Sequence, residues 1–170
     1  MLPVTERPKS RRPLYTPEER QRRDASAWTW VQGVLAPVQF LVFLISLALV
    51  WRFLVTGEGG ALAAGSVVVK TLVLYTIMVT GSFWEKDVFG VYLFAPAFYW
   101  EDVVSMAVLA LHTAYLVAWY ADWLSPQALM LLALTAYAVY LINAAQFVLK
   151  LRAARLSAPS AGTAAQAGAA

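Results

Sequence analysis

Four of the ten acidic residues of this 170-residue chain lie in one stretch between two long apolar segments. They are Glu85 and Asp87 after Trp84, and Glu101 and Asp102 after Trp100. Bulky apolar rings lower the local dielectric constant, which raises the pKa of a carboxylic acid and makes it a usable proton donor near neutral pH. Two such pairs that face each other indicate general acid–base chemistry. The alternative is a set of solvated charges at helix ends, with Lys86 paired to one of them and the helix dipole favouring Glu101 and Asp102.

The single histidine, His112, is the second candidate. It lies eleven residues beyond Glu101 and on the same helical face, about three turns and roughly 16 Å deeper along the axis. A histidine inside a membrane helix is expensive and therefore favours a function, such as binding the magnesium of a tetrapyrrole or orienting a water molecule. The alternative is a hydrogen bond to Tyr75, to Tyr140 or to a glutamine on a neighbouring helix.

Other polar residues within the apolar segments have two interpretations each. Gln32, Gln39, Asn143 and Gln146 either join helices by hydrogen bonds or line a pocket for the carbonyl groups of a ligand. Lys70 either extends towards the nearer membrane interface, pairs with Glu58, or meets a ligand carboxylate.

Composition and patterning predict an all-α integral membrane protein, because 61% of the residues are hydrophobic and only 14% are charged. We expect a four-helix bundle with spans at about 27–55, 61–84, 98–121 and 126–151. Pro37 should kink the first span. Gln32, Gln39 and Ser46 are spaced by seven, so they share a face that should point into the protein. Gly90 and Pro96 argue against a continuous helix between the second and third spans.

The basic residues predict the orientation. Ten of the thirteen lysines and arginines lie near the two ends of the chain, so both termini should be cytoplasmic. The stretch with the four carboxylates then lies on the cytoplasmic side of the membrane. Residues 1–15 read as a flexible basic segment without a cleavable signal peptide, and residues 157–170 as a disordered tail. Between them, Thr16 to Glu19 has the pattern of a capping box that starts a short amphipathic helix on the anionic leaflet.

Composition also excludes several classes of site. The chain has no cysteine, which excludes disulfides, cysteine-ligated metals and thiol nucleophiles. A single histidine excludes a multi-histidine metal or haem site within one chain. We therefore expect no cofactor and no metal of the protein's own, and the terminal position of the basic residues argues against nucleic-acid binding.

Five segments together resemble the 3-vinyl (2-vinyl) bacteriochlorophyllide hydratase family: 14–20, 31–41, 81–90, 93–102 and 111–115. The resemblance covers about residues 14–155, and Trp84-Glu85-Lys86-Asp87 and Trp100-Glu101-Asp102 carry most of its weight. It implies addition of water to the ring-A vinyl group of chlorophyllide a or a bacteriochlorophyllide, which gives a 1-hydroxyethyl group. Such a hydro-lyase would act in the lipid membrane, as a multi-pass protein of a bacterial inner or intracytoplasmic membrane. Contact with neighbouring enzymes of the pathway is plausible there because the substrate is insoluble.

The residues permit the following hypothesis for that reaction. Glu101 or Glu85 is the general acid, and the carboxylate of the opposite pair, Asp87 or Asp102, is the base. His112 holds the magnesium or the macrocycle, and Lys86 meets the propionate. Gln39 and Asn143 line the pocket, and the stacking side chains are Trp84, Phe89, Phe94, Phe98, Tyr99 and Trp100. The competing class is a non-enzymatic pigment-binding or assembly subunit, which needs His112 and aromatic residues but no facing carboxylates. A proton-coupled exporter is disfavoured, because the mid-span charged or titratable residues are Lys70 and His112 rather than a carboxylate.

Overall fold

The computed structural model describes residues 14–156 as five helices joined by short connections, with no strand in this range. The helices are α1 (Pro17–Ala25), α2 (Ala27–Thr56), α3 (Gly60–Phe89), α4 (Tyr99–Tyr120) and α5 (Pro126–Leu156). Helices α2 to α5 are long and apolar enough to cross a membrane, which confirms the predicted all-α fold with four candidate spans. The segments predicted to be disordered, 1–13 and 157–170, lie outside the described residues.

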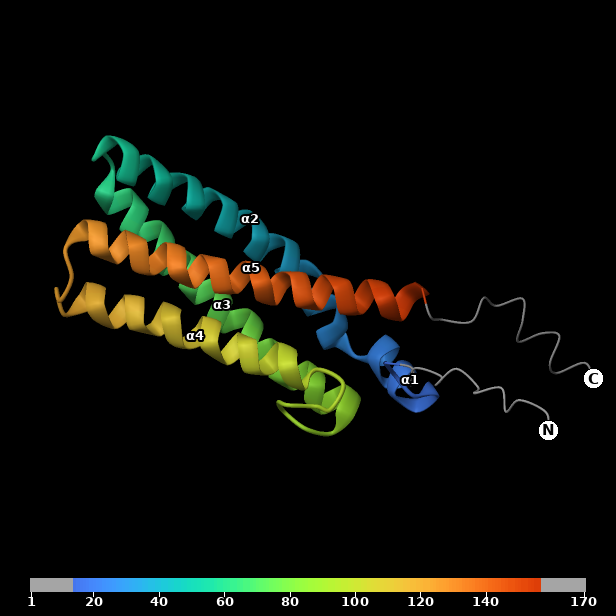
Figure 1. Cartoon of the computed structure of the whole chain (residues 1–170). Helices are drawn as coiled ribbons and strands as arrows, with labels where there is room; N and C mark the ends of the chain where they lie inside the picture. Colours follow the sequence, from blue (N-terminus) through green and yellow to red (C-terminus); the bar gives the residue numbers. More distant parts are fainter. Residues whose placement is uncertain (1–13, 157–170) are drawn as a thin grey trace, which may run out of the picture.

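The four long helices form two antiparallel pairs. Helix α2 packs most extensively against α3, and α4 against α5. Helix α1, the α3–α4 loop and the C-terminal end of α5 lie at the same end of the bundle (Figure 1), which is called the loop end below. The buried core contains Phe43, Val67, Val108 and Tyr137 from all four helices. Many large apolar side chains point outward, as a lipid-facing surface requires.

Helix α1 begins with the predicted capping box. The Thr16 hydroxyl accepts a hydrogen bond from the Glu19 backbone N–H at 3.2 Å, and the Glu19 carboxylate accepts one from the Thr16 N–H at 2.8 Å. Tyr15, just before this cap, is buried rather than part of a loose segment. Its ring stacks on Phe89 with centroids 5.8 Å apart, so α1 is attached to the end of α3.

Helix α2 carries the predicted inward polar face. Gln32 donates to the Thr80 hydroxyl of α3 at 2.7 Å, and Gln39 and Ser46 are buried. The prediction for this face is therefore confirmed, and the helix continues through Pro37.

Helix α3 extends to Phe89, five residues beyond the expected end, so Glu85, Lys86 and Asp87 are helical. Gly90 has φ 82° and ends the helix because a residue without Cβ adopts the left-handed conformation without strain. The connection that follows, residues 90–98, is the α3–α4 loop. It occupies the position where the sequence predicted a break.

Candidate active site

Glu85 and Asp102 face each other at the loop end. Glu85 lies in the last turns of α3 and Asp102 in the first turn of α4, and their carboxyl groups lie side by side, close enough to share a hydrogen bond. The exposed fractions are only 5% for Glu85 and 3% for Asp102. A hydrogen bond between two carboxyl groups requires a proton on one of them, so this pair contains both a proton donor and a proton acceptor.

The α3–α4 loop supplies one backbone donor to each carboxyl group. Phe94 N–H donates to Asp102 Oδ2 at 2.7 Å, and Ala95 N–H donates to Glu85 Oε2 at 3.1 Å. Phe94 has φ 61°, a left-handed conformation that costs a residue with a Cβ about 1 kcal/mol or more. The strained residue is therefore one of the two consecutive residues, Phe94 and Ala95, whose N–H groups bind the two carboxyl groups.

Glu101 is buried next to this pair but has a different partner. Its carboxylate pairs with Lys150 of α5, whose ammonium also donates to the Ala97 carbonyl at 2.5 Å. Asn143, also on α5, donates to the Glu101 backbone carbonyl at 2.9 Å and accepts from Ser105 at 3.2 Å. Asn143 therefore joins α5 to α4, and the Glu101 carboxylate is paired with the Lys150 ammonium.

Asp87 and Lys86 point away from the carboxyl pair. Asp87 is exposed and accepts a hydrogen bond from the Ser26 hydroxyl at 2.7 Å, which ties α3 to the start of α2. Lys86 is also exposed, and its ammonium donates to the Gly90 carbonyl at 2.9 Å and lies 5.2 Å from the centre of the Tyr92 ring. Of the four candidate carboxylates, the structure brings Glu85, Glu101 and Asp102 together and places Asp87 elsewhere.

The aromatic residues of the stretch divide into two groups. A buried aromatic cluster contains Tyr15, Trp84, Phe89, Phe98 and Phe147, and Trp84 also donates to the Thr29 hydroxyl at 3.0 Å. An exposed aromatic platform contains Phe94, Tyr99 and Trp100, whose rings pack with centroids 5.8 Å and 5.5 Å apart. Of these two groups, the platform is the one that can contact a planar ligand without unpacking the bundle. Burial raises the pKa of Tyr15 in the buried aromatic cluster, although the nearby Arg23 opposes this.

His112 lies deep in the bundle and is fully buried. Its Nδ1 bonds to the Val108 carbonyl at 2.8 Å, which assigns the proton to Nδ1 and leaves Nε2 as the acceptor from Lys70 Nζ at 3.0 Å. The Lys70 ammonium also lies 3.9 Å from the centre of the Tyr140 ring. Lys70 therefore turns inward, and the sequence missed this partner because 42 residues separate it from His112. The predicted pairing with Glu58 is wrong, since Glu58 is exposed and faces Arg52.

Three buried polar atoms have no hydrogen-bond partner within the described part of the chain: Gln39 Oε1, Gln146 Oε1 and the Tyr115 hydroxyl. Gln39 therefore faces the interior, as predicted for a helix-joining or pocket-lining amide. No group of three or more acidic, histidine or cysteine residues in 14–156 has the arrangement of a metal site.

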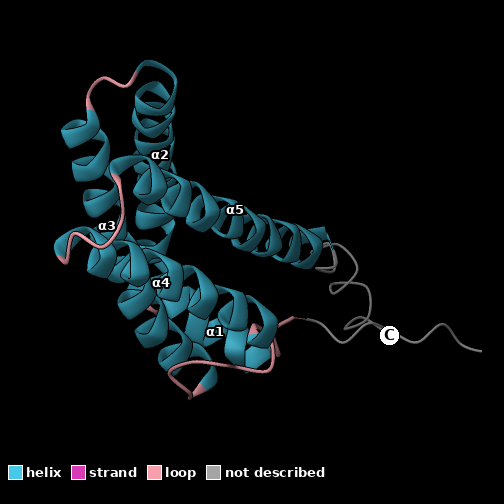
Figure 2. Cartoon of the chain, turned by 60° about the vertical axis from the view of Figure 1, so that its left-hand side comes forward, coloured by secondary structure: helices cyan, strands magenta, loops and turns pink. Residues whose placement is uncertain are grey.

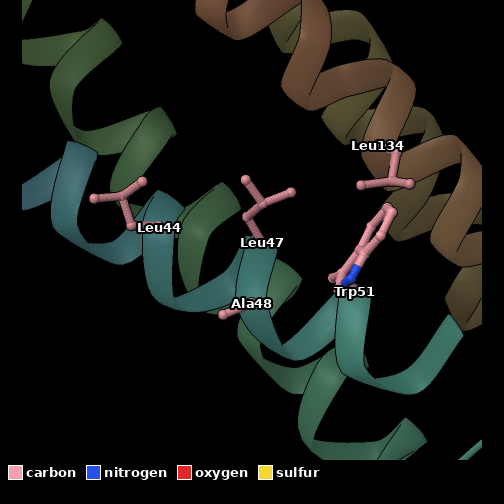
Figure 3. A pocket seen from close by; sticks show the side chains of 5 residues that line it. All are labelled: Leu44, Leu47, Ala48, Trp51 and Leu134. Atoms are coloured by element: carbon pink, nitrogen blue, oxygen red, sulfur yellow. The ribbon is translucent and has the colours of Figure 1, made fainter. Parts of the chain in front are cut away.

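A surface groove lies away from the carboxyl pair. It has a volume of about 450 Å³ and runs between α2 and α5, lined by Leu44, Leu47, Ala48, Trp51 and Leu134. Figure 3 shows the side chains of Leu44 and Leu47 projecting from α2 and the Trp51 ring beside Leu134. The lining is apolar and offers no acid or base, so it cannot perform the chemistry that the carboxyl pair can.

Comparison with known proteins decides the family. The family model described as 2-vinyl bacteriochlorophyllide hydratase matches residues 15–153. The chain belongs to the 2-vinyl bacteriochlorophyllide hydratase family. A curated 2-vinyl bacteriochlorophyllide hydratase of Rhodobacter capsulatus is 60% identical over 165 residues, which cover 95% of each chain. That of Cereibacter sphaeroides is 62% identical over 151 residues, 88% of this chain and 93% of its own. No solved structure matches the chain.

Membership of the hydratase family confirms the resemblance found in the sequence. The match begins at Tyr15 and thus includes α1, all four candidate spans and the α3–α4 loop. The sequence analysis did not foresee that Lys150 pairs with Glu101, or that two loop N–H groups bind Glu85 and Asp102. The spacing in the sequence could have indicated this role for Lys150. It lies two turns after Asn143, which was already a candidate, and on the same face of α5.

Proposed function

We propose that this chain hydrates the vinyl group of chlorophyllide a or a bacteriochlorophyllide, with Glu85 and Asp102 as acid and base. Family membership supplies the reaction, because the curated relatives are named 2-vinyl bacteriochlorophyllide hydratase. One observation carries the choice of site: two buried carboxyl groups from different helices lie side by side at one end of the bundle, each accepting a hydrogen bond from one of two consecutive loop N–H groups. Of the acidic residues in 14–156, only this pair provides a donor and an acceptor side by side.

The reaction is redox-neutral. Glu85 transfers its proton to the terminal vinyl carbon, and the positive charge on the carbon next to the ring spreads into the macrocycle. Water attacks that carbon and loses a proton to Asp102, which gives the 1-hydroxyethyl product. The proton then returns from Asp102 to Glu85 through the hydrogen bond between them, and the pair is ready for the next turnover.

The loop contacts support this assignment of acid and base. The hydrogen bond from the Phe94 N–H to Asp102 is 2.7 Å long, which is typical of a charged acceptor. The hydrogen bond from the Ala95 N–H to Glu85 is longer, at 3.1 Å. A charged Asp102 leaves the shared proton on Glu85. Glu101 is a poorer acid because Lys150 holds its carboxylate, and Asp87 is a poorer base because it is exposed and bonded to Ser26.

The exposed aromatic platform is the proposed binding surface for the macrocycle. Trp100 is 69% exposed and Tyr99 47% exposed, and both lie within three residues of Asp102. A planar apolar substrate gains from stacking on such rings. The vinyl group reaches the buried pair when the α3–α4 loop shifts, and the strained Phe94 makes this movement less costly. Lys86, in the last turn of α3, is the cation that we assign to the propionate.

His112 and Gln39 do not enter this site. On α4, His112 lies ten residues after Asp102, roughly 15 Å along the helix axis and therefore deeper in the bundle than the pair. Binding of the substrate magnesium by His112 would also require Nε2, which accepts from Lys70. The proposed site faces the cytoplasm, because the loop end carries Arg20 and Arg22 of α1 and Arg152 and Arg155 of α5.

The direct test is conversion in a host that makes no chlorophyll. Membranes containing the protein are given chlorophyllide a under nitrogen in oxygen-labelled water, and the pigment is followed by mass spectrometry. Hydratase activity adds one water, retains the labelled oxygen and shifts the red absorption band to the blue. Pigment that purifies unchanged with the protein would instead support a pigment-binding subunit.

A further inference from the structure

Lys150 joins three elements at the proposed site. Its ammonium donates to the Ala97 carbonyl at 2.5 Å, pairs with the Glu101 carboxylate and lies 5.1 Å from the centre of the Phe98 ring. These three residues form the end of the α3–α4 loop and the first turn of α4, whereas Lys150 comes from α5. One side chain therefore fixes the position where the loop becomes helix.

The same loop places the N–H groups on the carboxyl pair. Phe94 and Ala95 donate to Asp102 and Glu85, and Ala97 follows only two residues after Ala95. Asp102 itself follows Glu101 directly. Release of Ala97 and Glu101 from α5 would therefore displace the loop donors and Asp102 together. A displacement of about 1 Å at reacting groups can cost about 100-fold in rate.

A second residue of α5 supports the same turn. Asn143 lies seven residues before Lys150, two helical turns away on the same face. It donates to the Glu101 backbone carbonyl at 2.9 Å and accepts from Ser105 at 3.2 Å. Helix α5 thus holds the first turn of α4 at two points, and Lys150 is the one that also holds the loop.

We infer that Lys150 is a positioning residue for the hydration reaction: by binding Ala97 and Glu101, it keeps Asp102 and the loop donors aligned with Glu85. This inference rests on the proposed function of the Glu85–Asp102 pair. Within residues 14–156, Lys150 makes no hydrogen bond or ion pair with either of these carboxyl groups, so it acts through the loop and the first turn of α4 and through the field of its charge at Asp102.

The test compares Lys150→Met with Lys150→Arg in the full-length protein in membranes. Methionine keeps the apolar stem without the charge, and we expect kcat to fall about 10- to 100-fold while KM stays within about threefold. Arginine restores a cation that can reach both the Ala97 carbonyl oxygen and the Glu101 carboxylate. Lys150→Arg should therefore recover kcat to within about threefold of wild type. Arg152→Met, an exposed neighbour on α5, is the matched control and should behave as wild type.

A second variant covers the case in which Lys150→Met does not fold. Removal of Lys150 alone leaves the buried Glu101 carboxylate unpaired, which is strongly destabilising. The combination Lys150→Met with Glu101→Gln removes that charge and should fold, yet its kcat should remain low because Ala97 still lacks its donor. Wild-type kcat in this double variant, an effect confined to KM, or failure of arginine to rescue overturns the inference.

Glu85→Gln separates the two proposals. If Glu85→Gln abolishes turnover while Lys150→Met keeps wild-type kcat, only the role of Lys150 is wrong. If Glu85→Gln itself turns over as wild type, the carboxyl pair is not the acid and base, and both proposals fail together.

Discussion

The carboxyl groups of Glu85 and Asp102 lie side by side although they belong to different helices, and two consecutive loop residues each donate a backbone hydrogen bond to one of them. The α3–α4 loop, the end of α3 and the start of α4 therefore form one unit. A substrate must displace part of this loop to reach the pair, which makes the loop part of the reaction as well as part of the fold.

Removal of either carboxyl group should stop the reaction. We expect Glu85→Gln and Asp102→Asn each to lower kcat by about 100-fold or more, since general acid–base catalysis contributes about 10² to 10⁴. The double variant should be little worse than either single variant, because the two groups act as a unit. The measurement is the rate at which labelled oxygen from water enters the pigment product. Glu58→Gln, at the opposite end of the bundle, is the control. Independent, additive losses would argue against a shared proton.

Trp100 should affect substrate binding more than stability. Its ring is 69% exposed, so Trp100→Ala removes little packing within the bundle, whereas it removes a stacking surface for the macrocycle. We expect KM to rise about 5- to 20-fold with kcat within about threefold, from steady-state assays in membranes. Trp123→Ala, a tryptophan of similar exposure beyond α4, is the control and should leave KM unchanged.

Tyr15 should make the attachment of α1 sensitive to alkaline pH. Burial raises the pKa of Tyr15 in the folded chain above its ordinary value, against the opposing effect of Arg23. A raised pKa of this acid means that its contribution to stability is complete below about pH 10 and is lost as the pH rises further. The melting temperature of the wild type should therefore fall relative to that of Tyr15→Phe as the pH rises above about 10. A pH-independent difference would contradict this.

The Lys70–His112 pair should matter for stability and not for the reaction. His112→Leu leaves the buried Lys70 amine without its acceptor, and we expect the free energy of unfolding to fall by about 3 kcal/mol or more. Lys70→Met should cost less, because His112 keeps its bond to the Val108 carbonyl. Unfolding in mixed detergent measures both. A tenfold rise in KM at unchanged stability would instead place the substrate at His112.

The predicted orientation can be tested with single cysteines, because the chain has none of its own. We expect Pro96→Cys, in the α3–α4 loop, to react with a membrane-impermeant maleimide only after the cells are lysed. Glu58→Cys, in the α2–α3 connection, should react in intact spheroplasts. The reverse pattern would place the carboxyl pair on the periplasmic side.

The sequence by itself determined the helical membrane architecture, the inward face of α2, the cap of α1 and the family. These features depend on local hydrophobicity, on residue spacing and on motifs of a few residues, all of which are readable along one chain. The sequence also located the acidic stretch, because charges are rare within so apolar a chain.

Only the tertiary structure decided which polar groups meet. Glu101 and Asp102 are adjacent in the sequence, but they point in different directions around α4, one towards Lys150 and the other towards Glu85. Asp87 is two residues from Glu85 and bonds to Ser26 on the opposite side of α3. Successive residues of a helix are rotated by about 100°, so neighbours in sequence become partners of different helices. The pairing is therefore set by how the helices pack around one another, which no local pattern encodes.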